Sequence, residues 1–149
     1  VIHNVTNKVS AWLSGQLMLS VIIGSTAALG LWMLGVPYFY VLALVAAIGE
    51  MIPVVGPIMA AVPAILVALT VSPQTAAFTI IYFTAQQFIE NHFLVPRVME
   101  RQVGVSPVTV IAALLIGSEL LGIVGALLAV PTAAIVQVLV SEYLDRDNK

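Results

Sequence analysis

The sequence predicts an all-α, polytopic transmembrane protein with two full spans and two broken helical hairpins that form an inverted repeat. Of its 149 residues, 61% are hydrophobic and only 8% are charged, with a mean hydropathy of +1.12. Soluble domains average about 25% charged residues. The apolar sequence from Val9 to Ile89 is nearly continuous and far exceeds the ~20 residues that cross a bilayer. We therefore expect residues 1–149 to form a single membrane domain.

The composition also excludes several classes of protein. A net charge of −2 without a basic stripe argues against a nucleic-acid partner, and the absence of cysteine excludes disulfides and thiolate sites. No metalloprotease, nucleophile-elbow or phosphate-loop motif is present. We expect no enzyme activity, no cofactor and no metal site. The first residues show no signal-peptide pattern, and we expect the chain to be a piece of a longer protein.

The first two segments are an amphipathic helix and a full span. Residues 1–12 carry apolar side chains at helical spacing, which predicts a helix at the membrane interface or one that continues from a preceding domain. Residues 11–34 form the first span, and Ser20, Gly24 and Ala28 give it a ridge of small residues for helix packing. Gln16 lies one turn inside, where it either faces the interface or lines a translocation path.

Residues 37–72 form the first broken hairpin. Pro53, Gly56 and Pro57 interrupt the segment, and each arm of about 15 residues reaches only ~22 Å, short of the ~30 Å hydrocarbon core. We therefore predict a helical hairpin with its tip at residues 52–57. Glu50, at this tip, is the only charged residue between Lys8 and Glu90.

Residues 74–95 form the second full span, which we expect Pro96 to end. Polar side chains gather at its last turns, where Gln86 and Glu90 share one helix face and Asn91 lies on the adjacent one. Glu90 either pairs with Arg97 or Arg101 in the next loop or lines a vestibule, together with Gln86 and Asn91.

Residues 105–143 form the second broken hairpin, with Gly117, Gly122 and Gly125 at its tip. When Glu50 is aligned with Glu119, Val55-Gly56 falls on Val124-Gly125. This alignment predicts that the two hairpins are an internal repeat.

The basic residues predict the orientation. If each hairpin returns to the side from which it entered, all lysines and arginines and both ends of the chain lie in the cytoplasm, as the positive-inside rule requires. The two hairpins then enter from opposite faces, because one full span separates them. Inverted broken elements that meet near the midplane are typical of secondary transporters.

The sequence resembles the autoinducer-2 exporter family over essentially its whole length. The resemblance is carried by Gly15-Gln16, Gly35-Val36-Pro37-Tyr38, Glu50-Met51-Ile52-Pro53-Val54-Val55-Gly56-Pro57, Pro63, Gln87-Phe88-Ile89-Glu90-Asn91, Leu94-Val95-Pro96, Pro107, Ile116-Gly117, Gly122-Ile123-Val124-Gly125 and Ala129-Val130-Pro131. It implies a multi-pass protein of the inner membrane that exports a small quorum-sensing signal or exchanges cations for protons. It also implies preceding spans, a helical arm and a homo-oligomer. Glu119 departs from the family pattern, which has small or apolar residues there.

Two interpretations of Glu50 remain open. A carboxylate in hydrocarbon is costly when charged, so Glu50 is either a proton or cation site or a structural cap for the freed amides of the tip. Glu119 either shares a proton with Glu50 across the two tips or faces a subunit interface. The function we expect first is export of a small solute through a bilayer. A sodium or other cation/proton antiporter uses the same carboxylates, and a passive channel or oligomeric scaffold is the third alternative.

Overall fold

The computed structural model describes residues 2–52, 55–99 and 107–147, and every regular element in these ranges is a helix. The chain divides into two compact units. One contains Gln16–Arg97, and the other contains Val1–Gly15 and Val98–Lys149. The all-α prediction is confirmed.

The first helix, α1, is continuous from Ile2 to Met33. No proline occurs before Pro37, so nothing removes a backbone donor within this stretch. The predicted amphipathic segment 1–12 is therefore the beginning of α1 rather than a separate helix. Gly35 and Tyr38, both with positive φ, turn the chain after α1.

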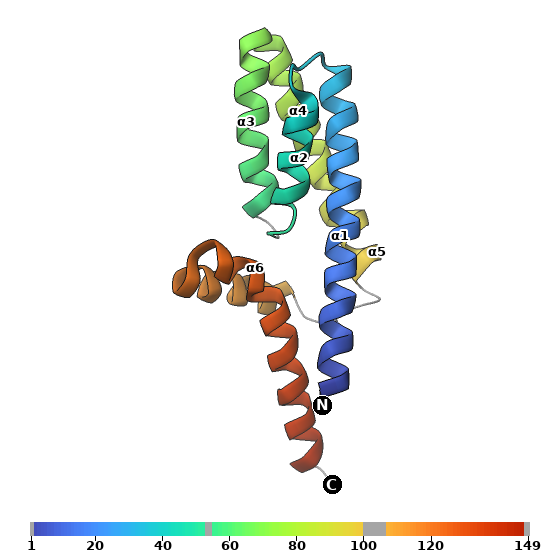
Figure 1. The fold of residues 1–149 in the computed structure, drawn as a ribbon, viewed down its shortest axis with the longest axis vertical. Helices are drawn as coiled ribbons and strands as arrows, with labels where there is room; N and C mark the ends of the chain where they lie inside the picture. Colours follow the sequence, from blue (N-terminus) through green and yellow to red (C-terminus); the bar gives the residue numbers. More distant parts are fainter. Residues whose placement is uncertain (1, 53–54, 100–106, 148–149) are drawn as a thin grey trace. The chain divides into compact units, whose positions relative to one another are not determined.

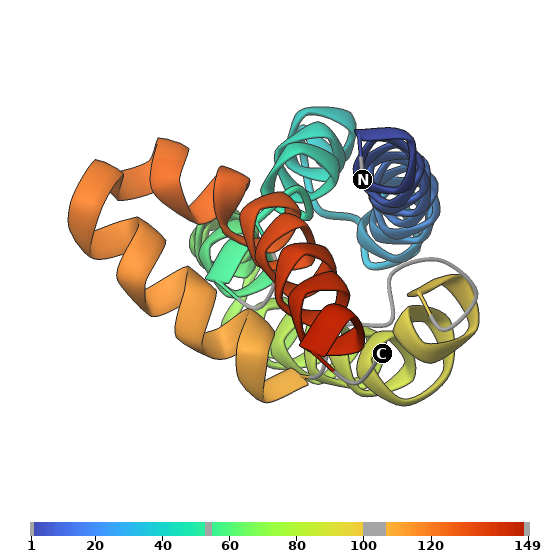
Figure 2. The same cartoon turned by 90° about the horizontal axis from the view of Figure 1, so that it is seen from below.

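The first predicted hairpin is formed by α2 (Phe39–Gly49) and α3 (Val55–Val71), which lie side by side (Figures 1 and 2). The chain between them begins with Glu50. Within it, residues 53–54 lie outside the described part. Helix α4 (Pro73–Ile89) follows and packs along α3. Ser72 caps α4 by accepting a hydrogen bond of 3.0 Å from the Thr75 backbone.

Small residues allow the helices of the Gln16–Arg97 unit to approach closely. A Cβ added at Gly24 of α1 would lie 2.7 Å from the Cβ of Ala47 on α2, and one added at Gly30 would overlap the Tyr82 ring of α4. The buried side chains between the helices are largely alanine, among them Ala27, Ala43, Ala46, Ala60, Ala64 and Ala68. Close packing of small residues is the arrangement expected where lipid supplies no hydrophobic drive for helix association.

The end of α4 differs from the prediction. Helix α4 passes into a π-helical turn, η1 (Glu90–Leu94), and then into α5 (Val95–Met99), so Pro96 does not end the helix. In a regular α-helix the ring of Pro96 would clash with the carbonyl of His92, four residues earlier. The wider π turn includes His92 and relieves that clash, and such turns are frequent at functional sites.

The last helical segment, α6 (Pro107–Asp147), is two helical arms joined at Gly122. Gly122 has φ 58° and ψ −135°, a conformation open to glycine but strained for other residues. The chain folds back there, which agrees with the tip predicted for the second hairpin. Leu114, Ala126, Ala129 and Ala133 are its buried side chains among those described.

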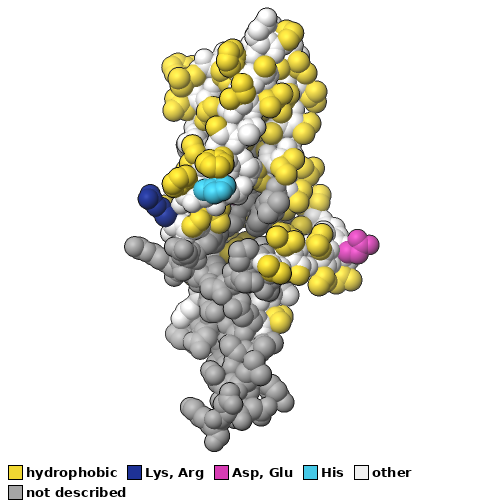
Figure 3. All heavy atoms as spheres, turned by 180° about the vertical axis from the view of Figure 1, so that it is seen from behind, with side chains coloured by type: hydrophobic (Ala, Val, Ile, Leu, Met, Phe, Trp, Pro, Cys, Tyr) yellow, Lys and Arg dark blue, Asp and Glu magenta, His cyan; other side chains and the backbone are white. Residues whose placement is uncertain are grey.

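Among the residues that the structure describes, one helical stretch, Val9–Met33, is long and apolar enough to cross a bilayer alone. The other apolar helices described are shorter, at Phe39–Gly49, Val55–Val71 and Ile111–Ala126. Residues 74–95, expected as the second full span, are helical throughout and belong to α4, η1 and the first residue of α5. Hydrophobic side chains cover most of the described surface in Figure 3, with few charged groups among them.

Candidate functional site

Glu50 lies at the end of α2 with its side chain inside the protein. Its backbone N–H donates to the carbonyl of Ala46 at 2.9 Å and so closes the last turn. Only 2% of the residue is exposed, and the carboxylate oxygen Oε2 is buried without a hydrogen-bond partner. A carboxylate oxygen in this setting carries a substantial desolvation cost unless something binds it.

Gln16 connects α1 to this site. Its side chain is buried, and its Nε2 donates a hydrogen bond to the backbone oxygen of Glu50. The bond gives a partner to one of the carbonyl groups freed where α2 ends. Gln16 thus fixes the position of Glu50 from a neighbouring helix, a role that neither sequence interpretation included.

Glu90, the first residue of η1, brings a second carboxyl group to the same place. It is 4% exposed, and its carboxyl group interacts directly with that of Glu50. Arg97, the basic partner expected for Glu90, is exposed, and Arg101 lies outside the described residues. No basic residue occurs among the buried side chains that the structure describes. Two neighbouring carboxylates cannot both stay charged in such a site.

Gln86, one turn before Glu90 on α4, contacts α1. Its Nε2 donates to the Ile23 carbonyl and to Thr26 Oγ1, each at 3.2 Å. Tyr82 lies one turn further along and donates its hydroxyl to the Thr26 carbonyl at 2.6 Å. These bonds leave the Gln86 oxygen Oε1 buried without a partner.

Ser20 is a site residue that the sequence analysis treated only as part of a packing ridge. Its hydroxyl is buried and has no hydrogen-bond partner. Thr26 and Thr79, in comparable helical positions, each donate to the carbonyl four residues earlier. The signal available in the sequence was the spacing of Gln16 and Ser20, which lie one turn apart on the same face of α1.

The remaining predicted site residues are exposed, lie elsewhere in this unit, belong to the other unit or lie outside the described residues. Asn91 is exposed beside Glu90. Glu119 is exposed in the other unit, on the first arm of α6. Pro57 is buried at the start of α3, and Pro53 lies outside the described residues. Of the predicted residues, Gln16, Glu50, Gln86 and Glu90 are thus brought together within one unit.

Gly56, predicted at the first tip, meets Gly49, a glycine that was not among the predicted tip residues. A Cβ added at Gly49 would lie 2.9 Å from the carbonyl oxygen of Gly56 and 3.4 Å from the Cβ of Ala60. Conversely, a Cβ at Gly56 would overlap the carbonyl of Gly49. Neither position has room for a side chain, so the crossing of α2 and α3 depends on both glycines.

The α6 hairpin repeats this contact. A Cβ added at Gly117 would overlap the carbonyl of Gly125 and lie 3.4 Å from the Cβ of Ala129. When the two hairpins are compared through these contacts, Gly117 corresponds to Gly49. Ser118, rather than Glu119, then corresponds to Glu50. The sequence alignment was displaced by one residue there, because the α6 hairpin has one more residue between its glycines.

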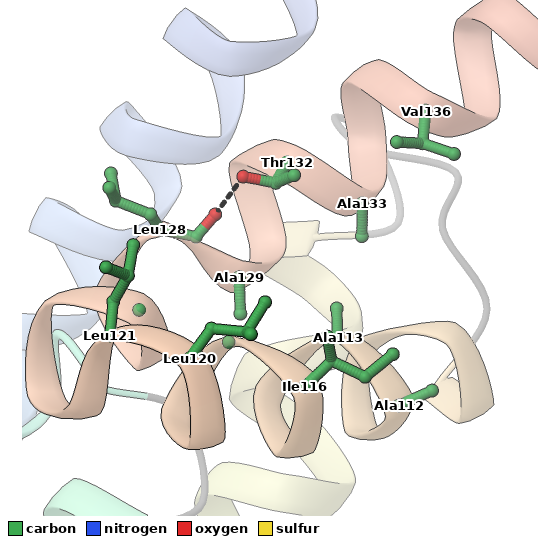
Figure 4. A pocket seen from close by; sticks show the side chains of 12 residues that line it. Ala112, Ala113, Ile116, Leu120, Leu121, Leu128, Ala129, Thr132, Ala133 and Val136 are labelled. Carbon is green, nitrogen blue, oxygen red and sulfur yellow. Dashed lines mark hydrogen bonds between the residues drawn. The ribbon is translucent and has the colours of Figure 1, made fainter.

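An apolar groove of about 620 Å³ runs between the two arms of α6 (Figure 4). Its floor contains Gly117, Gly125 and Ala129, and leucine side chains such as Leu120 and Leu128 form its walls. Thr132 donates its hydroxyl to the Leu128 carbonyl at 2.7 Å, so it offers no free donor. The groove contains no ionisable group and differs in this from the cluster around Glu50.

Comparison with known proteins identifies the family. The family model described as AI-2E family transporter matches residues 1–145. The chain belongs to the AI-2E transporter family. The members of this family that it resembles are described as transport proteins rather than enzymes.

Three relatives illustrate the range of this family. The putative transport protein YrrI of Bacillus subtilis is 36% identical over 96% of this chain and 40% of its own length. The AI-2 transport protein TqsA of Escherichia coli is 31% identical over 92% of this chain and 40% of its own length. A sodium-lithium/proton antiporter of Halobacillus andaensis is 29% identical over 80% of this chain and 34% of its own length. The chain thus spans about two fifths of the length of the curated relatives it matches.

Proposed function

We propose that this chain forms the coupling part of a secondary transporter that exports a small solute in exchange for protons, with Glu50 and Glu90 as the proton-carrying pair. The supporting observation is the direct interaction of two buried carboxyl groups in a unit whose described interior contains no basic residue. Such a pair lowers its charge by holding a proton.

A proton held between two carboxyl groups is exchangeable. When the site opens to one side of the membrane, water can solvate the carboxylates and the proton can leave. When the site is closed, hydrocarbon and packed helices favour the protonated form. The protonation state of the pair is therefore linked to the conformation of the protein, which is the requirement for coupling transport to a proton gradient.

Cation/proton antiport is the second candidate, because the same pair can exchange its proton for a cation. The similarity to the Halobacillus antiporter favours this candidate, and the similarity to TqsA favours an organic solute. We further propose that the protein lies in the inner membrane as a homo-oligomer, with both ends of this segment in the cytoplasm, as its basic residues suggest. A passive channel or scaffold would need no proton-carrying pair.

The test uses the full-length protein in liposomes with a pH-sensitive dye inside. In one experiment a sodium chloride pulse is applied, and in another AI-2 is placed in the lumen under a proton gradient. We expect proton movement with one of the two, and its loss in Glu50→Gln and in Glu90→Gln. The matched control is Glu119→Gln, which changes an exposed carboxylate and should leave the rate unchanged.

Two results would contradict the proposal. If Glu50→Gln and Glu90→Gln move protons at the wild-type rate, the pair is structural. If AI-2 or sodium only equilibrates and never accumulates against its gradient, the protein is a passive channel.

A further inference from the structure

Glu90 is the residue at which α4 changes from an α-helix to the π turn η1. Its backbone N–H donates to the carbonyls of Gln86 and Gln87, within α4. Its own carbonyl accepts a hydrogen bond from the N–H of Val95, five residues later, which is the π-helical pattern. Such a turn holds one residue more than an α-helical turn. The residues that follow are therefore displaced by about 100° around the helix axis from the positions that a regular α-helix would give them.

Arg97 is the charged residue that this displacement affects. It follows Glu90 by seven positions, and in a regular α-helix the two residues would lie within about 20° of one another around the axis. The Arg97 side chain would then lean back along the helix toward Glu90. In the structure Arg97 is exposed, whereas Glu90 is buried. This difference agrees with a displacement of Arg97 away from the face that carries Glu90.

The buried face of α4 ends at the same place. Ala76, Thr79 and Glu90 are buried and Phe83 is half-buried, at spacings that keep them on one face of an α-helix. Phe93, three residues after Glu90, would continue this face in a regular α-helix but is 52% exposed. The α-helical register of the buried face therefore stops at η1.

Pro96 opposes the α-helical alternative. It has no N–H to donate to the carbonyl of His92, and its ring would clash with that carbonyl. A proline does not require a π turn, however, because Pro63 lies inside α3 and α3 remains α-helical. The wider turn at Glu90 therefore calls for an explanation beyond the fit of a proline ring.

We propose that Pro96 is a positioning residue, which holds η1 as a π turn and so keeps Arg97 off the helix face that carries Glu90. A guanidinium group on that face would favour the fully ionised form of the Glu50–Glu90 pair, and the pair would give up its proton. The inference rests on the proposed function, because the displacement of Arg97 matters only if the pair carries a proton.

Few other charges act on Glu90 within the described part of the chain. Helix α1 has no charged residue after Lys8, α3 has none, and α2 ends at Glu50. Tyr82, the other titratable side chain of α4, is bonded to a carbonyl of α1. His92 is exposed, and its ring stacks on Phe88 with the ring centres 4.2 Å apart. Moving one guanidinium onto the Glu90 face would therefore change the charge around the pair substantially.

The experiment follows the protonation of the pair directly. The infrared band of the protonated carboxyl group is recorded against pH in the purified full-length protein, and Glu90→Gln assigns the band. In Pro96→Ala a backbone N–H becomes available to the His92 carbonyl, so the turn can close into an α-helix. We expect the band to disappear at a pH lower by about one unit, the effect of a unit charge roughly 10 Å away at an effective dielectric constant of ~20. The pH profile of proton movement in liposomes should shift in the same direction.

Three variants serve as matched controls. Pro96→Ala/Arg97→Gln should titrate as the wild type does, because the helix is rotated but the charge is gone. Arg97→Gln alone changes an exposed side chain and should also leave the band unchanged. Pro63→Ala removes a helix-interior proline from α3, which contributes no side chain to the pair, and should have no effect on the band. The unfolding midpoint of Pro96→Ala should not fall, because proline disfavours a helix interior.

The inference is overturned if Pro96→Ala titrates as the wild type does, or if Pro96→Ala/Arg97→Gln keeps the shift. A wild type that moves protons, combined with an unshifted Pro96→Ala, rejects this inference and leaves the proposed function standing. A band that shifts in Pro96→Ala and returns in the double variant, in a protein that moves no protons, supports the role of Pro96 and rejects the proposed function.

Discussion

The two hairpins share one backbone contact and differ in their chemistry. In each, a pair of glycines brings the arms together, Gly49 with Gly56 and Gly117 with Gly125. The α2–α3 hairpin presents a buried carboxylate beside this contact. The α6 hairpin has Ser118 at the matching position, and its hydroxyl bonds back to the Leu115 carbonyl at 3.0 Å. The glycine contact therefore brings the arms together in both hairpins, and the residue after the first glycine decides whether a carboxylate lies beside that contact.

The surroundings of the two hairpins also differ in polarity. Helices α1 and α4 supply Gln16, Gln86 and Glu90 around the end of α2, so Glu50 has polar neighbours inside the protein. The groove of the α6 hairpin is lined by apolar side chains, and Glu119 is exposed. A buried charge requires such neighbours, and only the α2–α3 hairpin has them among the residues described.

The largest expected effect separates the two acidic residues. Glu90→Gln should reduce proton-coupled transport to the rate of protein-free liposomes, because the pair loses its second carboxyl group. Glu119→Gln should transport at the wild-type rate. The dye assay on the full-length protein measures both. Equal losses in the two variants would show that the exposed carboxylate of the α6 hairpin matters as much for transport as the carboxyl group that faces Glu50.

The next effect concerns the glycine contacts. Gly56→Ala and Gly125→Ala should each reduce stability by about 1–3 kcal/mol, because the new methyl group overlaps a carbonyl of the opposite arm. Gly56→Ala should in addition reduce transport, since it moves Glu50 relative to Glu90. Thermal unfolding and the dye assay are measured on the same preparations. A stable Gly56→Ala with normal transport would mean that the arms separate without disturbing the pair.

An effect on stability alone is expected at the turn of α6. Gly122→Ala should cost about 1–3 kcal/mol through backbone strain alone, because its positive φ suits only glycine while a Cβ there meets no atom within 4 Å. Gly35, which also has positive φ and open space, is the comparison in the other unit. Gly35→Ala should lower the unfolding midpoint by a similar or smaller amount. An unchanged midpoint in Gly122→Ala would show that the turn can adopt another conformation.

The smallest effect tests a helix cap. Ser72→Ala should cost about 1 kcal/mol, because Ser72 caps α4 through the Thr75 backbone N–H. Ser118→Ala, which removes an exposed bond within a helix, should stay within about 0.5 kcal/mol of the wild type. Urea or thermal unfolding of the full-length protein compares the two. A larger loss in Ser118→Ala than in Ser72→Ala would contradict the ranking.

The sequence alone determined the helical class, and it placed chain breaks near Glu50 and near Gly122. These features depend on local chemistry. An apolar segment that contains a charged residue and two prolines can adopt few structures in a bilayer. Glycines mark the places where the backbones of two helices come close together. The structure at the end of α4 could not be predicted in this way, because Pro96 ends a helix only if the preceding turn stays α-helical rather than becoming a wider π turn. The π turn resolves that conflict and includes Glu90.

Only the tertiary structure decided which residues meet. The sequence suggested Glu119 as a partner for Glu50 and Arg97 as a partner for Glu90, yet Glu50 and Glu90 interact with each other. They are 40 residues apart in the sequence, and their meeting depends on how α1, α2 and α4 pack through small residues. The same packing leaves Ser20 and Gln86 with free buried oxygens. The spacing of residues along one helix shows which side chains share a face of that helix. Which other helix packs against that face depends on the tertiary structure.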